Sequence, residues 1–159
     1  DENRCKAISE NLKLIREKIE ASAVKSGRNY EDIRLMAVTK TVPVEYINYS
    51  IDNCGINLIG ENKVQEFMMK EPELMMSNCK AHLIGHLQSN KVKKIVGRVE
   101  TIQSVDSVSI AKEIGKRSSE AGIETKILLE VNVGNEDSKF GFMYDEVYEK
   151  YTDSRCSVF

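Results

Sequence analysis

The first part of the chain has the apolar spacing of one long helix. Between residues 5 and 25, apolar side chains recur at steps of three and four, at Ile8, Leu12, Ile15, Ile19 and Ala23. This spacing places them along one face, which we expect to pack against the rest of the protein. Gly27 follows and can end the helix. The pattern therefore predicts a helix over residues 5–25.

After this helix, short apolar runs alternate with amphipathic segments. The runs predict five β-strands, at 35–39, 57–60, 81–85, 101–105 and 126–133. The segments between them predict helices, at 44–54, 62–70, 90–96 and 106–121. Asp106 is the expected cap of the last helix, and Gly122 its end. Strand starts recur every ~20–26 residues, a spacing typical of βα units that build parallel sheets.

Two α/β architectures fit this pattern. One is an open, doubly wound parallel sheet, and the other is part of a closed (β/α) barrel. A barrel of eight strands typically needs about 250 residues. The chain has 159 residues, a length that favours a single domain over residues 1–159.

Composition narrows the class of protein. Hydrophobic residues make up 41% of the chain and charged residues 30%, which is typical of a soluble globular protein. The net charge of −2 predicts no general attraction to nucleic acid or to an anionic membrane. The two histidines and the four dispersed cysteines have no spacing typical of a metal site. We therefore expect reduced thiols, no metal and a cytoplasmic location.

Lys40 is the most informative candidate residue, because functional groups gather at the carboxyl ends of parallel strands. Strand alternation places it on the same face as Met36 and Val38, where its amine would be partly desolvated. A neutral amine is nucleophilic and suited to a Schiff base with a carbonyl compound. The alternative is a strand-end lysine that reaches water or pairs with a carboxylate such as Glu61.

Three other polar residues lie at neighbouring strand ends. His82 and His86 are four residues apart, in and just after the third predicted strand. They could stack on or hydrogen-bond to an aromatic ligand, or His82 could be a satisfied core histidine. Asn62 could cap the following helix or reach a ligand.

Five stretches carry recognisable motifs in one order along the chain. They are LMAVTKT (35–41), IGENKVQE (59–66), HLIGHLQSNKVK (82–93), IQSVDS (102–107) and VNVGNEDSKFG (131–141). Together they resemble the pyridoxal phosphate homeostasis family, whose barrel is related to the N-terminal domain of alanine racemase.

This resemblance implies a fold, a cofactor and site residues. The fold would be a parallel (β/α) barrel of the TIM or alanine-racemase N-terminal type. The cofactor would be pyridoxal 5′-phosphate (PLP), held as a Schiff base on Lys40. Asn62, His82 and His86 would lie near it. The resemblance implies a carrier of the cofactor, or a regulator of vitamin B6 and amino-acid pools, without a defined catalytic reaction.

The resemblance ends before the family's late motifs. Family members look like complete barrels with roughly three further strands, whose motifs supply phosphate contacts, and those motifs are absent from this sequence. We therefore expect an incomplete barrel of about five strands out of eight. We also expect this chain to bind PLP more weakly than full-length relatives do. The full-length relatives would be monomeric, whereas this chain would self-associate through an exposed sheet edge.

Two alternative functions remain open at this point. One is a PLP-dependent enzyme of the amino-acid racemase type, which would need acid/base groups on both faces of the substrate carbon. The other is a truncated isoform without cofactor function.

Overall fold

The computed structural model describes residues 1–134, 136, 139–144 and 147. The chain forms two compact units. The first consists of residues 1–59 and 70–80, and the second of residues 60–69 and 81 onward. In the described part of the chain, no helix combines the length and the apolar character needed to cross a membrane.

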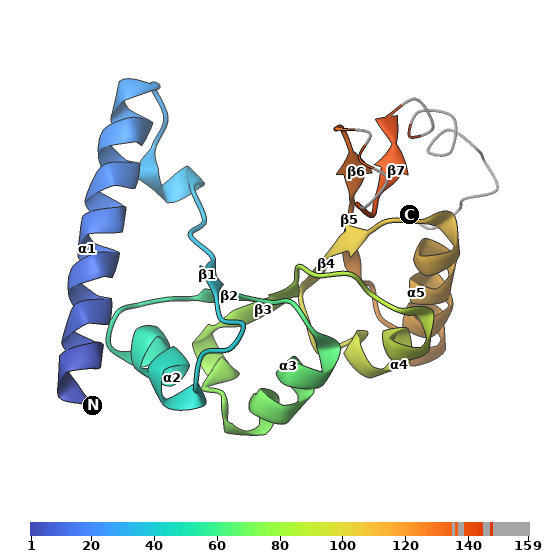
Figure 1. The fold of residues 1–159 in the computed structure, drawn as a ribbon, viewed down its shortest axis with the longest axis horizontal. Coiled ribbons are helices and arrows are strands. Elements are labelled where there is room, and N and C mark those ends of the chain that lie inside the picture. The colour runs from blue at the N-terminus through green and yellow to red at the C-terminus, as the bar shows by residue number, and fades with distance from the viewer. Residues whose placement is uncertain (135, 137–138, 145–146, 148–159) are drawn as a thin grey trace. The chain divides into compact units, whose positions relative to one another are not determined.

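All five predicted strands are present. They are β1 (Ala37–Val38), β2 (Leu58–Glu61), β3 (Lys80–Leu83), β4 (Thr101–Val105) and β5 (Lys126–Leu129). They are hydrogen-bonded in the order β1-β2-β3-β4-β5, and β3, β4 and β5 are parallel (Figure 1). A doubly wound sheet reverses its strand order partway, whereas a barrel keeps the order of the sequence. The order therefore selects the barrel architecture that the sequence left open.

The first unit is built around the predicted N-terminal helix. This helix, α1 (Glu2–Lys25), begins with Asp1, whose side chain accepts a hydrogen bond of 3.0 Å from the Asn3 N–H. It packs against α2 (Val44–Asp52), and the Ser9 hydroxyl lies 2.9 Å from that of Tyr49. Of its apolar stripe only Ala23 is buried, and Ile15 is 42% exposed. The expected burial of the whole stripe was therefore wrong, since α2 and its neighbours cover only part of that face.

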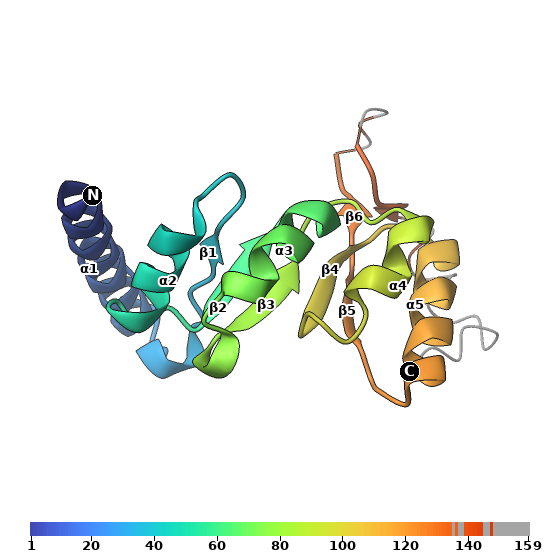
Figure 2. The same cartoon turned by 90° about the horizontal axis from the view of Figure 1, so that it is seen from below.

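The second unit has helices on one side of its strands. The helix α3 (Val64–Lys70) follows β2, and α4 (Val92–Ile95) and α5 (Val108–Ala121) follow β3 and β4. Figures 1 and 2 show α4 and α5 on the same side of β4 and β5. The core between these layers contains fully buried aliphatic side chains, Leu83, Val92, Ile95, Ile102 and Ile114. Register places Leu83, Ile102 and Ile127 in one row on this face.

The cap of α5 differs from the prediction. Ser107 is its N-cap, and the Ser107 side chain accepts a hydrogen bond from the Ile110 N–H. Asp106, the predicted cap, instead lies against His86. The helix ends as predicted at Gly122, whose φ of 64° lies in the left-handed region that favours glycine.

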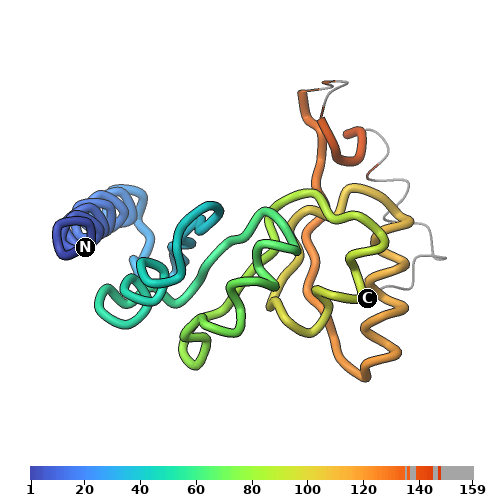
Figure 3. Tube along the Cα trace, turned by 60° about the horizontal axis from the view of Figure 1, so that its bottom comes forward, coloured from blue at the N-terminus to red at the C-terminus, as the bar shows by residue number. Residues whose placement is uncertain are grey.

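The last predicted strand is shorter than expected. β5 ends at Leu129, and the chain continues as β6 (Val131–Asn132). β6 pairs in parallel with β7 (Phe142–Met143) as a separate small sheet, drawn in orange and red in Figure 3. β7 was not predicted, because two residues carry no periodicity.

Candidate functional site

Lys40 lies just beyond β1, at the carboxyl end of the strand. Thr39, before it, is buried, and the Thr39 carbonyl accepts a hydrogen bond of 2.8 Å from Lys70 Nζ. Thr41, after it, has a φ of 61° and is the only non-glycine residue with positive φ among those described. A threonine rarely adopts this conformation. The two neighbours thus fix the backbone of Lys40 at a sharp strand end.

The side chain of Lys40 is exposed, and Val38 on the same face is 50% exposed. The predicted desolvation of the amine was therefore wrong. The strand packs through its other face, that of Ala37 and Thr39, so the face of Lys40 meets solvent. An exposed amine at a fixed backbone position is nevertheless accessible to a small aldehyde.

Asn62 belongs to a tightly packed set of strand ends in the second unit. The Ile84 N–H donates to the Glu61 carbonyl at 2.9 Å. A Cβ on Gly85 would come within 2.3 Å of the Asn62 carbonyl oxygen, so only glycine fits there. The Ser104 hydroxyl donates to the Gly85 carbonyl. The helix α3 begins two residues after Asn62, at Val64.

His82 is buried in β3 with both ring nitrogens in contact with polar side chains. Its Nε2 lies 3.0 Å from Glu100 Oε2, and its Nδ1 lies 2.8 Å from Gln103 Nε2. An ionised carboxylate only accepts hydrogen bonds, and an amide nitrogen only donates. His82 therefore carries its proton on Nε2 and accepts at Nδ1, the geometry of a satisfied core histidine.

His86 lies in the loop after β3 and contacts two other loops. Its Nδ1 lies 2.7 Å from Asp106 Oδ2, just after β4. Its ring stacks on Phe140, with centroids 3.9 Å apart and planes inclined by 13°. The Asp106 side chain is 8% exposed and that of His86 38% exposed. The carboxylate thus orients the imidazole by accepting from Nδ1–H, which leaves Nε2 directed away from Asp106.

The structure divides the predicted site residues between the two units. Lys40 belongs to the first unit, and Asn62, His82 and His86 belong to the second. Sequence reasoning missed the partners of the two histidines, which are Glu100, Gln103, Asp106 and Phe140. The one available signal was the position of Asp106 directly after a strand. The contacts of Glu100, Gln103 and Phe140 depend on the pairing of segments that are distant in the sequence.

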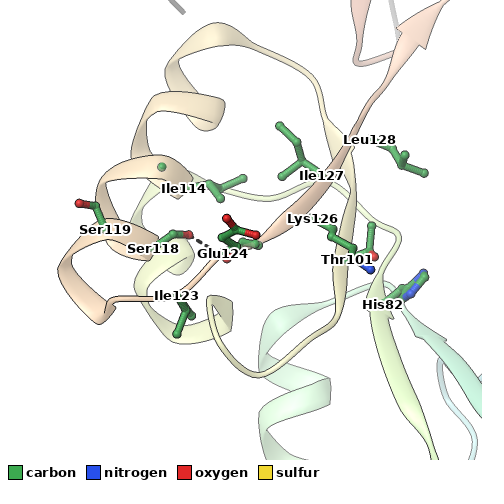
Figure 4. Close-up of a pocket in the computed structure, with 12 residues that line it drawn as sticks. His82, Thr101, Ile114, Ser118, Ser119, Ile123, Glu124, Lys126, Ile127 and Leu128 are labelled. Atoms are coloured by element: carbon green, nitrogen blue, oxygen red, sulfur yellow. Dashed lines mark hydrogen bonds between the residues drawn. The ribbon is translucent and has the colours of Figure 1, made fainter. Parts of the chain in front are cut away.

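A cavity of about 830 Å³ lies elsewhere in the second unit (Figure 4). Thr101 and Lys126, the first residues of β4 and β5, line it together with His82 of β3 and residues at the end of α5. It therefore lies at the amino ends of these strands, away from Asn62, His86 and Asp106. Among the residues that the structure describes, no group of three His, Cys, Asp or Glu side chains could hold a metal ion.

Comparison with known proteins gave curated relatives but no matching model of a protein family. The chain is 39% identical over 142 residues to the pyridoxal phosphate homeostasis protein of Aquifex aeolicus. It is 34% identical over 145 residues to the protein of that name in Escherichia coli. Each match covers 89% of this chain and 62% of the relative. The chain thus spans about three fifths of the length of these relatives.

Solved structures have the same fold. An unknown protein from Bifidobacterium adolescentis matches with a TM-score of 0.80 and 35% identity, over 89% of this chain and 61% of that one. PipY of Synechococcus elongatus with PLP bound matches with a TM-score of 0.69 and 28% identity, over 84% and 61%.

Alanine racemase of Clostridium difficile matches with a TM-score of 0.65 and 14% identity, over 89% of this chain and 36% of that one. At this identity, the match shows the fold alone. The fold is therefore the α/β fold of the alanine-racemase type, of which this chain contributes five parallel-sheet strands. Over the stretch that it shares with its relatives, the chain is similar to the pyridoxal phosphate homeostasis proteins, at 34–39% identity.

Proposed function

We propose that the chain is a PLP-binding protein of vitamin B6 homeostasis that holds the cofactor through Lys40 and catalyses no reaction of its own. The observation that carries this proposal is the exposed amine of Lys40, fixed between Thr39 and Thr41 at the carboxyl end of β1. Parallel α/β folds collect their functional groups at this end of the strands. A solved relative, PipY, binds PLP.

The side chains at the strand ends suit the aldehyde and the ring of PLP. Lys40 supplies a primary amine, Asn62 an amide and His86 an imidazole oriented by Asp106. We assign Lys40 to covalent attachment, and Asn62 and His86 to contacts with the polar groups and the ring. His82, buried with both nitrogens hydrogen-bonded, would act by supporting β3 beneath the site.

PLP supplies an aldehyde that combines reversibly with amines. The role of Lys40 follows from that reversibility: its amine holds the cofactor covalently, and water or a competing amine, such as an amino acid, releases it. The same exposure that makes Lys40 accessible to the aldehyde admits these competitors. This suits a carrier in the cytoplasm, with PLP and amino acids as partners and no nucleic acid or membrane.

The phosphate group is the part of PLP that the residues of this chain accommodate least well. A phosphate dianion is held mainly by backbone N–H groups and helix N-termini. The late motifs to which the resemblance assigns these phosphate contacts are absent from this sequence. We therefore expect PLP to bind this chain more weakly than it binds a full-length relative.

The direct test is incubation with PLP, borohydride reduction and peptide mass spectrometry. A pyridoxyl group on Lys40, together with an imine absorption band, would support the proposal. Lys40→Arg keeps the charge but cannot form the bond, so it should lose both signals. Lys63→Ala, which removes another exposed lysine, is the control and should keep them.

Two results would count against the proposal. Labelling spread equally over surface lysines, with the band intact in Lys40→Arg, would remove Lys40 from its role. Racemisation of an amino acid by the purified PLP-loaded chain would remove the claim that it catalyses no reaction.

A further inference from the structure

A shallow groove between the helices α3 and α4 is a surface feature that the proposed function does not use. Its volume is about 610 Å³, and its lining comes from the two helices and the segment after α4: Gln65, Met68, Met69, Lys93, Lys94 and Arg98. All six residues belong to the second unit. The strands before the two helices, β2 and β3, are neighbours in the sheet. Strands joining either edge of the sheet would therefore not enter between these helices.

The apolar part of the groove comes from α3. Val64 and Phe67 of this helix are buried in the core. Met68 and Met69 line the groove instead, with Gln65 one turn earlier, and Met69 is 71% exposed. Methionine side chains are flexible and polarisable, and they serve at surfaces that bind varied partners. The helix α3 therefore offers an adaptable apolar contact, which gains free energy when a partner removes it from water.

The polar part of the groove is positively charged. Lys93 and Lys94 are exposed on α4, because the other two residues of this helix, Val92 and Ile95, are fully buried. Neither lysine forms an ion pair with a residue that the structure describes. Arg98 adds a third positive charge, and it already has an interaction within the chain. No acidic residue lines the groove, whereas the chain as a whole has a net charge of −2.

We propose that this groove binds an acidic amphipathic helix of a partner protein. The apolar face of such a helix would pack on Met68 and Met69, and carboxylates along its border would pair with Lys93 and Lys94. The groove offers side chains of helices and no strand edge. A segment that satisfies its own backbone hydrogen bonds, as a helix does, therefore fits it better than an extended strand. This proposal is independent of PLP.

Two other classes of partner fit the groove less well. Single-stranded nucleic acid is usually held by aromatic side chains on which its bases stack, and none lines the groove. The net charge of −2 gives no wider positive field for a phosphate backbone. Recognition of an anionic membrane takes a cluster of about four to eight basic residues. The combination of a few charges with an apolar contact therefore favours a protein partner.

A peptide library tests the kind of partner. Amphipathic peptides of about 20 residues, long enough to form a helix, would share one face of leucines. Glutamate, lysine and glutamine would be distributed at random along the borders of that face. Selection would use the PLP-free 159-residue chain, with counter-selection against Met69→Ala so that only peptides that use the groove are kept. We expect glutamate to be enriched at the border positions.

Affinity measurements on the most enriched peptide then locate its charged contacts. By fluorescence anisotropy, Lys93→Glu combined with Lys94→Glu should weaken binding by about tenfold or more, because two attractive pairs become repulsive. The control is Lys112→Glu combined with Lys116→Glu, which makes the same charge change on two exposed lysines of α5. It should weaken binding by less than about twofold, because distant surface charges are screened. The NMR signal of the Met69 methyl group should shift when the peptide binds.

Several outcomes would overturn the proposal. Recovery of no peptide that distinguishes the chain from Met69→Ala would show that the groove holds no helix. Enrichment of lysine or glutamine, or equal loss of affinity in the two double variants, would exclude pairing with Lys93 and Lys94. A single-stranded oligonucleotide that displaces the peptide and shifts the Met69 methyl signal would reassign the groove to nucleic acid. The methyl measurement uses the unmodified chain, so an absent shift counts against the proposal even where a variant unfolds.

Discussion

The Nδ1 atom of His86 lies 2.7 Å from Oδ2 of Asp106, and this contact joins the loop after β3 to the end of β4. Asp106 is nearly buried, so the carboxylate is held where it meets the imidazole. Because the Asp106 side chain contacts His86, Ser107 is the N-cap residue of α5 in its place. The ring of Phe140 completes the group by stacking on His86.

The stack between His86 and Phe140 should be visible by NMR. An aromatic ring 3.9 Å away shields the protons of its neighbour, so Phe140→Leu should move the His86 ring-proton signals downfield. The His82 signals should not move, because its partners are Glu100 and Gln103. Unchanged His86 signals in the variant would show that the rings do not stack in solution.

The hydrogen bonds of His82 predict its tautomer. Nitrogen NMR shifts should report a proton on Nε2 and none on Nδ1, because Glu100 can only accept and the Gln103 amide nitrogen can only donate. Glu100→Ala would leave the buried Nε2–H without this acceptor and should lower the free energy of unfolding by about 1–3 kcal/mol. Urea denaturation measures this loss, and a variant as stable as the original would contradict the contact.

Gly85 should tolerate no side chain. Gly85→Ala would place its Cβ 2.3 Å from the backbone oxygen of Asn62, which cannot move aside as a flexible side chain can. We expect a loss of stability of about 2 kcal/mol or more. Gly122→Ala is the comparison, because nothing lies within 4 Å of its Cβ and only its left-handed backbone is strained. It should cost about 1 kcal/mol, and a reversed ranking of the two variants would refute the close approach.

Cys79 should make stability fall at alkaline pH. Burial raises the pKa of the Cys79 thiol above its ordinary value. Between the ordinary value, about 8.5, and the raised one, the unfolded chain loses a proton that the folded chain keeps. Stability therefore falls as pH rises through this window.

The measurement is the free energy of unfolding of the chain and of Cys79→Ala at pH 7, 9 and 10. The slope should be shallower in the variant. Alkylation gives a second readout, in which Cys79 should react more slowly than Cys5 and Cys54, both less buried. Equal slopes and equal alkylation rates would show that the thiol is not buried in solution. Cys156 lies outside the described residues.

The sequence pattern predicted helices and strands well where an apolar repeat extends over many residues, or where one residue such as glycine ends a helix. The helix over 5–25 and the strand over 101–105 are confirmed, as is Gly122 as a helix end. Motif resemblance predicted a similarity to the pyridoxal phosphate homeostasis proteins, which the curated relatives confirm. The assignment of Lys40, Asn62, His82 and His86 to the cofactor stays a prediction.

The failures have a common physical cause. The side of β1 that packs, the partners of His82 and His86, and the role of Asp106 all depend on segments that are distant in sequence. Alternation shows that Val38 and Lys40 share a face, but it does not show which face the rest of the fold covers.

By itself, the sequence determined where strands and helices form and which chemical groups stand at the strand ends, because these follow from local periodicity and from side-chain chemistry. Only the tertiary structure decided the strand order that selects a barrel and the exposure of Lys40. It also decided that His82 is satisfied by Glu100 and Gln103 while His86 is oriented by Asp106. These are consequences of pairing and burial between distant segments, which local patterns do not encode.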